Sequence, residues 1–258
     1  MRLMKRILSA AAVLALSASL LVGCSSGTAS SVPVSASSAA ESTVSSVEET
    51  ASSAVDENEA AAAQLLNDLT GSYQELWPVI LADEYKQTWL DDCTALGGEE
   101  NAEAAFEELS SMVTSDVYGE DAVEAYANGG GAYFCGFTNS LATLTFDGET
   151  STISGTDKDG NVLFSHTYHY IGMEPVHGLY EFESDDADSG EFTYFFLAPD
   201  TSAETYHIEF RYGSDAEALS QYDTGEYAYW LASGISTDCD QTMIDNCIEL
   251  FCTENLAG

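Results

Sequence analysis

The chain has 258 residues and a formal net charge of −38, because it contains 44 aspartates and glutamates but only 6 lysines and arginines. Such an acidic surface repels nucleic acid and anionic lipid and attracts cations, so we expect no nucleic-acid partner. The length allows one domain with a substantial core more readily than two small ones.

The first residues have the features of an export signal. Arg2, Lys5 and Arg6 precede an apolar stretch that is too short to cross a bilayer and that ends in LVGC. This ending matches the bacterial lipobox, in which the peptide is cut before the cysteine and the thiol carries fatty-acyl chains such as palmitate. We therefore predict a signal peptide over residues 1–23 and a lipid anchor at Cys24, which would hold the protein at the cell membrane, facing outside the cytoplasm.

The segment from Cys24 to residue 57 has the composition of a tether. It consists mostly of Ser, Ala, Val, Thr and Glu and contains no aromatic residue. Such a segment cannot bury enough apolar surface to offset the loss of chain entropy on folding. We predict that residues 24–57 are disordered and that one folded domain occupies residues 58–258.

Helical spacing marks the beginning and the end of this domain. Residues 56–70 place acidic residues before an alanine-rich body, and residues 71–96 and 101–113 repeat apolar residues at steps of three and four. Residues 236–251 form a last helical stretch. Its apolar side consists of Met243, Ile244, Cys247, Ile248 and Phe251.

From Gly129 the pattern changes to alternation with period two. Strand-like segments are separated by turn dipeptides such as Asp147-Gly148 and Asp159-Gly160. Consecutive short strands between helices indicate a mainly β fold with α additions, in which an antiparallel barrel or strongly curved sheet is flanked by N- and C-terminal helices. The acidic stretch DKDGN at residues 157–161 is expected to be a hairpin turn rather than a calcium loop.

The order of these segments resembles the ZinT (YodA) zinc-binding family. The resemblance runs from about Asp68 to the C-terminus and is carried by GSYQELWPVILADEYKQTW, AAFEELSSMVTSD, FTYFFLAP, HIEFRYGSD and YWLASGIS. It implies a lipocalin-like (calycin) barrel with extra helices, bound zinc, and a link to the binding protein of a zinc ABC transporter. In the family, three histidines hold the zinc: an HxH pair on one strand and a third histidine before an Ala-Pro on the preceding strand.

The zinc motif of that family is only partly present. His207 falls where the HxH pair begins, and Glu209 stands where its second histidine would be. Phe195 or its neighbour Tyr194 occupies the third position, and the histidine-rich loop of the family is absent. An imidazole and a carboxylate are acceptable zinc ligands, but two ligands alone rarely hold an ion, so a third is needed.

The other histidines supply candidates for the third ligand. His207 and Glu209 share a face, because residues two apart in a strand project to the same side. If the neighbouring hairpins close symmetrically, Phe195 lies opposite His207, and His169 lies opposite His177 on the same face. We therefore predict a divalent metal site formed by His207 and Glu209 and completed by His177, His169 or a nearby acidic residue.

The opposite face of the predicted sheet is aromatic and would form a core or line a pocket. Its members are Phe164, Tyr168, Tyr170, Tyr180, Phe182, Phe192, Tyr194, Phe196, Tyr206, Ile208, Phe210 and Tyr212. His166 falls on this face, which makes it a core histidine. Arg211, the only arginine after residue 6, is expected to pair with Glu209 or another carboxylate of the sheet.

Cysteine usage leaves the disulfide pairing open. After Cys24 the sequence contains Cys93, Cys135, Cys239, Cys247 and Cys252. An odd number allows at most two disulfides within one chain, and we expect at least one buried free thiol. Cys247 and Cys252 are five residues apart in a helical stretch, which is poor geometry for a bond between them.

The sequence contains none of the usual catalytic signatures: no GxSxG, HExxH, P-loop or dinucleotide fingerprint occurs. We therefore expect no enzymatic activity. The leading hypothesis is a monomeric, lipid-anchored protein that binds zinc or another divalent ion outside the cytoplasm and assists its uptake. The alternative is a metal-free barrel that binds a small apolar ligand or a protein partner.

Overall fold

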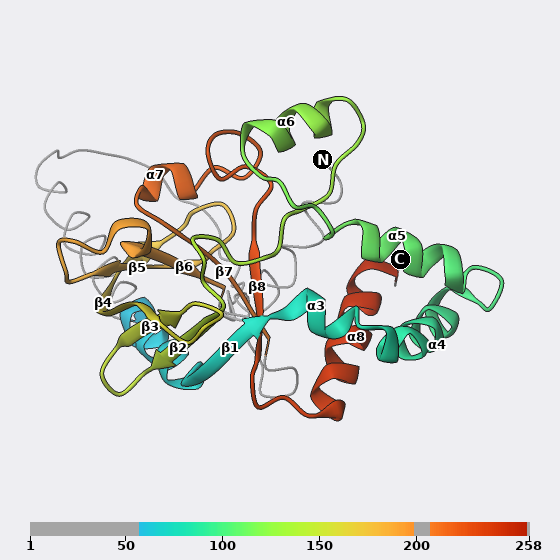
Figure 1. Cartoon of the computed structure of the whole chain (residues 1–258), viewed down its shortest axis with the longest axis horizontal. Helices are drawn as coiled ribbons and strands as arrows, with labels where there is room; N and C mark the ends of the chain where they lie inside the picture. Colours follow the sequence, from blue (N-terminus) through green and yellow to red (C-terminus); the bar gives the residue numbers. More distant parts are fainter. Residues whose placement is uncertain (1–56, 199–206, 257–258) are drawn as a thin grey trace, which may run out of the picture.

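Figure 1 shows the computed structural model of the chain, which describes residues 57–198 and 207–256. The predicted signal peptide, Cys24, nearly all of the predicted tether and Tyr206 lie outside the described residues. Within the described ranges, every helix is too short or too polar to cross a membrane.

The centre of the fold is a closed antiparallel barrel of eight strands (Figure 1). Each strand pairs with the next one along the chain, and β1 pairs with β8 to close the sheet. The strands are β1 (Gly71–Glu75), β2 (Thr143–Asp147), β3 (Thr152–Thr156), β4 (Val162–Met173), β5 (Tyr180–Ser184), β6 (Tyr194–Leu197), β7 (His207–Gly213) and β8 (Ala232–Ser236). The prediction of a mainly β fold, with an antiparallel barrel flanked by helices, is confirmed.

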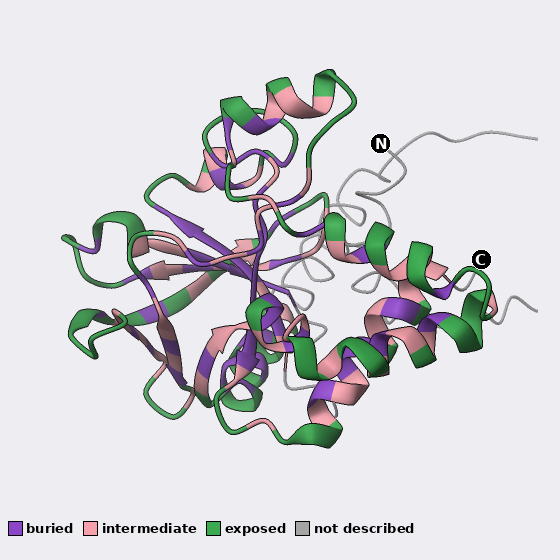
Figure 2. Ribbon diagram, turned by 45° about the vertical axis from the view of Figure 1, so that its right-hand side comes forward, coloured by how far each residue is buried: buried purple, intermediate pink, exposed green. Residues whose placement is uncertain are grey.

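Helices precede, interrupt and follow the strands. A helix over residues 57–68 comes before β1. The remaining elements are α3 (Leu76–Ile80), η2 (Asp83–Tyr85), α4 (Lys86–Gly97), α5 (Ala102–Ser111), α6 (Glu120–Ala127), η3 (Gly190–Phe192), α7 (Ala216–Leu219) and α8 (Gln241–Leu256). Figures 1 and 2 show α4, α5 and α8 side by side as a helical layer beside the barrel.

Aromatic rings fill the barrel interior. Phe195 and Tyr212 are fully buried, and their ring centroids lie 5.4 Å apart. Phe164 stacks on Phe192 with 4.0 Å between the ring centroids. The hydroxyl of Tyr212 accepts a hydrogen bond of 2.6 Å from the backbone NH of Thr138, so this polar group is satisfied inside the core. The alternation of apolar and polar residues in the sequence produces this interior, because every second side chain of a strand points inward.

A second core lies between the barrel and the helical layer. Trp89 of α4 is fully buried there, and its indole NH donates to the carbonyl of Ile80 at 2.7 Å. Phe251 of α8 packs edge-to-face against Trp77 of α3, with 4.6 Å between the ring centroids. The buried side chains of α8 are Ile244, Cys247, Ile248 and Cys252. The predicted apolar side of the last helix is therefore the side that faces this core.

The register between β6 and β7 differs from the prediction. Phe195 lies opposite Tyr212 and not opposite His207. The symmetric hairpin assumed from the sequence was wrong. Its register differs from the observed register of β6 and β7 by an odd number of residues, and an odd shift exchanges the two faces of a strand. Phe195 therefore points into the aromatic interior, where it is fully buried.

The same shift moves two other aromatic residues to the outer face of β6. Tyr194 and Phe196 were predicted on the interior face, and this prediction was wrong. The hydroxyl of Tyr194 donates to the carboxylate of Glu183 at 3.1 Å. Phe196 lies opposite Arg211 of β7 and is buried outside the barrel. Segments that cover the outside of the sheet at this point exclude water from both faces of β7.

The pairing between β4 and β5 also differs from the prediction. His169 lies opposite Glu183 and not opposite His177. His177 is in the turn that joins the two strands, so the alternation of a strand does not determine its direction. The assumption that this segment continued as strand was wrong, because Glu174 fixes the turn by accepting hydrogen bonds from the backbone NH groups of Val176 and His177.

The acidic stretch at residues 157–161 is a hairpin turn, as predicted. One carboxylate oxygen of Asp157 accepts hydrogen bonds of 2.9 Å from the backbone NH groups of Asp159 and Asn161. The side-chain amide of Asn161 donates to the other oxygen at 2.9 Å. These bonds hold the pKa of Asp157 below its usual value. Both carboxylate oxygens therefore have hydrogen-bond partners within the turn.

Candidate functional site

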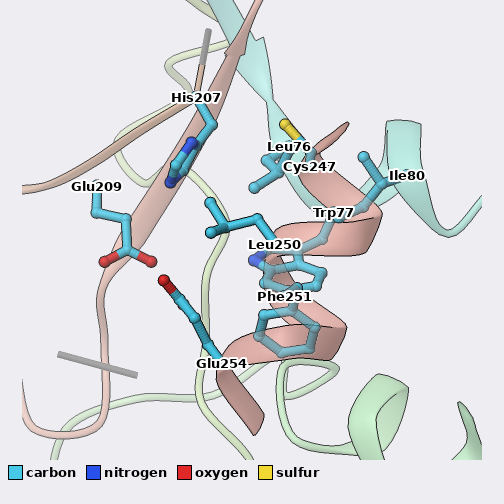
Figure 3. A pocket seen from close by; sticks show the side chains of 9 residues that line it. All are labelled: Leu76, Trp77, Ile80, His207, Glu209, Cys247, Leu250, Phe251 and Glu254. Atoms are coloured by element: carbon cyan, nitrogen blue, oxygen red, sulfur yellow. The ribbon is translucent and has the colours of Figure 1, made fainter. Parts of the chain in front are cut away.

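A small pocket lies between strand β7 and helix α8, with α3 as its third wall (Figure 3). Its polar side chains are His207 and Glu209 of β7 and Glu254 of α8. The other lining residues are Leu76, Trp77, Ile80, Cys247, Leu250 and Phe251. The pocket therefore combines an imidazole and two carboxylates with an apolar wall.

Strand alternation directs the two β7 residues toward this pocket. Ile208 and Phe210 are buried in the barrel core, so His207 and Glu209 project from the outer face of the strand. The predicted shared face of His207 and Glu209 is the face that meets the helical layer. Tertiary packing thus makes an outward-facing pair of a strand part of a pocket wall.

Helix α8 contributes the third polar group. Glu254 lies three residues after Phe251, which places both side chains on neighbouring parts of the helix surface. Figure 3 shows the carboxylate of Glu254 pointing toward the carboxylate of Glu209, with the ring of His207 on the same side of the pocket. All three side chains are partly exposed, so a dissolved ion can reach them.

The size of the pocket limits what it can hold. Its volume is about 30 Å³, which corresponds to one or two water molecules or a metal ion. Typical sites for small organic ligands are roughly ten times larger or more. The packed ring pair of Trp77 and Phe251 closes the apolar side. The pocket therefore suits an ion better than an organic molecule.

Two nearby thiols are kept protonated. Burial raises the pKa of Cys135, and the negative charge of Glu209 raises it further. Burial also raises the pKa of Cys247, to about 12. Because a thiolate rather than a thiol is the metal ligand, an ion would have to displace a proton to bind either cysteine at neutral pH. The other candidate metal ligands of this pocket are its carboxylate oxygens and its imidazole nitrogens.

The donor set suits a divalent ion in its chemistry, but the side chains are not yet arranged around one. Among residues 57–198 and 207–256, no three His, Cys, Asp or Glu side chains form a group that could hold a metal ion as they stand. Imidazole nitrogen and carboxylate oxygen are normal ligands of zinc. Binding of an ion by His207, Glu209 and Glu254 would therefore require their side chains to rotate toward a common centre.

His169 lies elsewhere, on the exposed outer face of β4. Its Nδ1 is 2.7 Å from a carboxylate oxygen of Asp185, and its Nε2 is 4.0 Å from one of Glu183. The structure does not bring His169 into the pocket of His207 and Glu209. As an exposed histidine beside two carboxylates, it belongs to the acidic surface of the barrel.

His177 also lies apart from the pocket, in the turn after β4. Its Nδ1 is 3.4 Å from the buried carboxylate of Glu174, close enough for an ion pair but without the geometry of a hydrogen bond. Its ring packs on Tyr222 with 3.8 Å between the centroids. Although burial acts to raise it, the close imidazole of His177 and the hydrogen bonds from the backbone NH groups of Val176 and His177 hold the pKa of Glu174 below its usual value. His177 thus has structural partners of its own.

His166 has the position predicted for it, on the aromatic face of β4. Its ring lies 5.9 Å from that of Phe164, centroid to centroid, and its Nδ1 is 2.8 Å from a carboxylate oxygen of Asp186. It faces the interior near an end of the barrel and does not line the pocket.

The structure therefore brings together one predicted pair and adds one residue that the sequence did not single out. His207 and Glu209 share a pocket, whereas His169 and His177 do not line it. Glu254 takes the place of the unspecified nearby acidic residue. Its only signal in the sequence is its position three residues after Phe251, on the predicted apolar side of the last helix.

Comparisons with known proteins yield structural matches alone. No protein-family model matches the sequence, and no curated protein does. Similar solved structures include the Zn(II)-bound ZinT-like domain of Streptococcus pneumoniae AdcA, with a TM-score of 0.45 and 16% identity, covering 71% of this chain and 89% of that one. Zn(II)-bound AdcA from the same organism has a TM-score of 0.44 and 14% identity, covering 72% of this chain but only 35% of its own length.

Because both TM-scores and both identities are low, no ligand, residue role or partner is transferred from these proteins to this chain.

Proposed function

We propose that the protein binds a divalent metal ion, with zinc as the first candidate, in the pocket between β7 and α8. The ligands are His207 and Glu209, with Glu254 as the third. The observation that carries this proposal is the convergence of an imidazole and two carboxylates, from two separate elements, on a pocket of about 30 Å³.

Electrostatics favour an ion at this position. Two carboxylates that face each other repel, and a divalent cation between them converts this repulsion into attraction. The strongly acidic chain also raises the local concentration of cations around the protein. One imidazole and two carboxylates form a harder ligand set than three histidines, so the site should distinguish zinc less sharply from other divalent ions.

We further propose that this binding takes place outside the cytoplasm on a lipid-anchored protein. The support is the lipobox sequence that ends at Cys24, followed by a segment with the composition of a tether. In this role the protein captures a metal ion near the membrane and passes it to the binding protein of an uptake transporter. The absence of catalytic signatures from the sequence favours binding over catalysis.

The alternative function is a metal-free barrel that works through contact with another protein. This alternative is favoured by the present positions of the pocket side chains, which would have to rotate before they could hold an ion. A small apolar ligand inside the barrel is a weaker candidate. The interior is occupied by packed rings such as those of Phe195 and Tyr212.

Titration calorimetry of the full chain with zinc tests the metal proposal. We expect one specific site in the wild type, and a loss of affinity of at least about tenfold in His207→Ala, Glu209→Gln and Glu254→Gln. Two matched controls, His169→Ala and His166→Ala, remove imidazoles that lie outside the pocket and should bind zinc as the wild type does.

The variants also separate the possible ligand sets. A loss of zinc affinity in His169→Ala or His177→Ala but not in Glu254→Gln would show that a histidine, and not Glu254, is the third ligand. Equal affinity in all variants would contradict the pocket assignment. If the wild type itself binds no zinc, cobalt or manganese, the metal-free alternative stands instead.

A further inference from the structure

Helices α4 and α8 bring two cysteines into contact in the second core. Cys93 lies in α4 and Cys252 in α8, and their sulfur atoms are 4.0 Å apart. Both side chains are fully buried in the second core. The five cysteines of the described ranges are thiols in this structure.

The other three cysteines are placed differently. Cys135 is buried beside Ser233 of β8, on the barrel side of the second core. Cys239 is only half-buried and precedes α8. Cys247 lies five residues before Cys252 in the same helix, so the two project in different directions and cannot bridge. The contact between α4 and α8 therefore selects one pair among several that the sequence left open.

We propose that Cys93 and Cys252 form a disulfide that joins α4 to α8. The sulfur atoms have to approach to about 2.05 Å, which small rotations of the two side chains can provide. The two helices are already held together at another point, where the hydroxyl of Thr88 lies 3.5 Å from a carboxylate oxygen of Asp245. The bond thus forms between elements whose packing is fixed by other contacts.

The chemistry is thiol–disulfide exchange with a low-molecular-weight disulfide such as oxidised glutathione. The sulfur of Cys93 attacks that disulfide and releases one glutathione thiol, and the sulfur of Cys252 then attacks the mixed disulfide and releases the second. Each protein thiol loses its proton, and two electrons pass to the glutathione disulfide. The protein gains one S–S bond and is oxidised, while the small disulfide is reduced to two thiols.

Burial determines when this exchange takes place. Both cysteines are fully buried in the folded protein, so the small disulfide cannot reach their sulfur atoms there. The bond is therefore expected to form while the chain folds, before the second core closes. Once formed, the bond is accessible to reductants only when the protein unfolds.

The bond would act on both the fold and the pocket wall. It joins residues separated by 159 positions, so it restricts the unfolded chain over most of the domain. Cys252 also lies two residues before Glu254, so the bond would fix the end of α8 that borders the pocket. It does not depend on whether the pocket binds a metal.

Peptide mapping tests the pairing directly. The full chain is unfolded, refolded with reduced and oxidised glutathione, and alkylated without prior reduction. A protease that cuts after aspartate and glutamate leaves Cys93 on residues 93–99, Cys252 on residues 250–254 and Cys247 on residues 246–249. We expect the peptides 93–99 and 250–254 as one joined species. Alkylation of both cysteines, or a joined peptide with a different partner, would overturn the proposal.

Thermal unfolding gives a second test with matched variants. A reductant should lower the unfolding midpoint of the refolded wild type by about 10 °C. Cys93→Ala and Cys252→Ala should not respond to the reductant, whereas the control Cys135→Ala removes another buried thiol and should respond like the wild type. A wild type that is insensitive to the reductant would contradict the proposal. Should either variant fail to fold, the peptide map of the wild type still decides.

Discussion

The guanidinium group of Arg211 lies over the ring of Tyr222, with 4.2 Å between its carbon and the ring centroid. Its NH groups donate hydrogen bonds to the backbone carbonyls of Leu219, Gln221 and Tyr227. One buried cation thus fastens the segment between β7 and β8 to the outside of the barrel. The side chain predicted to pair with a carboxylate of the sheet has backbone oxygens as its main partners.

Replacing Arg211 by Met should destabilise the protein strongly. The apolar side chain has a similar length but no donors, so the backbone carbonyls that it now binds would be left buried without partners. We expect the free energy of unfolding to fall by about 3–5 kcal/mol. Urea unfolding measures this change, and Lys158→Met, in an exposed turn, is the control. An unchanged urea midpoint would mean that other contacts hold the segment.

Glu174 should make stability depend on pH. The hydrogen bonds that it accepts in the turn after β4 hold its pKa below the usual value in the folded state. A lowered folded-state pKa stabilises the protein above the ordinary glutamate pKa, and this contribution is lost as the pH falls through the folded-state value.

Comparison with Glu174→Gln measures this contribution. The variant should be less stable than the wild type near neutral pH, and the difference in unfolding free energy should shrink on acidification below about pH 4. Glu149→Gln, at an exposed turn position, should show neither effect. A stability difference that grows as the pH falls would show that the pKa of Glu174 is raised instead.

Zinc binding should weaken in acid. A protonated imidazole cannot bind a metal ion, and carboxylates lose their charge at still lower pH. We expect the affinity to fall by at least about tenfold between pH 7 and pH 5, because protons compete with the metal ion for the imidazole over this range. Calorimetry at three pH values measures this trend. Affinity that is constant over this range would exclude His207 as a ligand.

The folded unit should begin shortly before the helix at residues 57–68. This helix contributes Ala62, Leu65 and Leu66 to the barrel core. A chain that starts at Val55 should therefore have the same urea midpoint as the full mature chain. One that starts at Gly71 should be markedly less stable, because it loses these contacts. A requirement for residues 30–50 would show that the predicted boundary is wrong.

Replacing Cys24 by Ala should release the protein from the membrane. The thiol is the only lipid attachment point that we predict, and so acidic a chain does not stay on an anionic surface by charge. Cell fractionation followed by immunoblotting measures the distribution, with Cys239→Ala as a control that keeps the lipobox intact. Persistent association of Cys24→Ala with membranes would indicate an uncleaved signal or a protein partner.

Local periodicity was sufficient to predict several parts of this structure. Alternation along β7 separates His207 and Glu209 from the buried Ile208 and Phe210, and it needs no information from other strands. Helical spacing likewise identified the buried side of α8. In both cases the repeat of the element fixes which side is apolar.

The pairing between elements could not be obtained in the same way. The positions of Phe195 and His169 depend on how many residues each connection takes up, and a single residue exchanges the two faces of a strand. The contribution of Glu254 depends on how α8 packs beside β7, which no local pattern encodes. Strand register and helix packing both depend on contacts between segments far apart in the sequence. Such contacts decide which side chain becomes the third polar group of the pocket.

The pairing of β1 with β8 has a consequence for how this protein can meet a partner. An open sheet exposes a row of unpaired NH and carbonyl groups, to which a second chain can add a strand. In the closed barrel, neighbouring strands pair these NH and carbonyl groups with each other. A second chain therefore cannot add a strand to the described part of this sheet. A partner has to recognise side chains instead, and on a chain this acidic the complementary surface is basic. The negative charge of two copies of the protein also acts against their association.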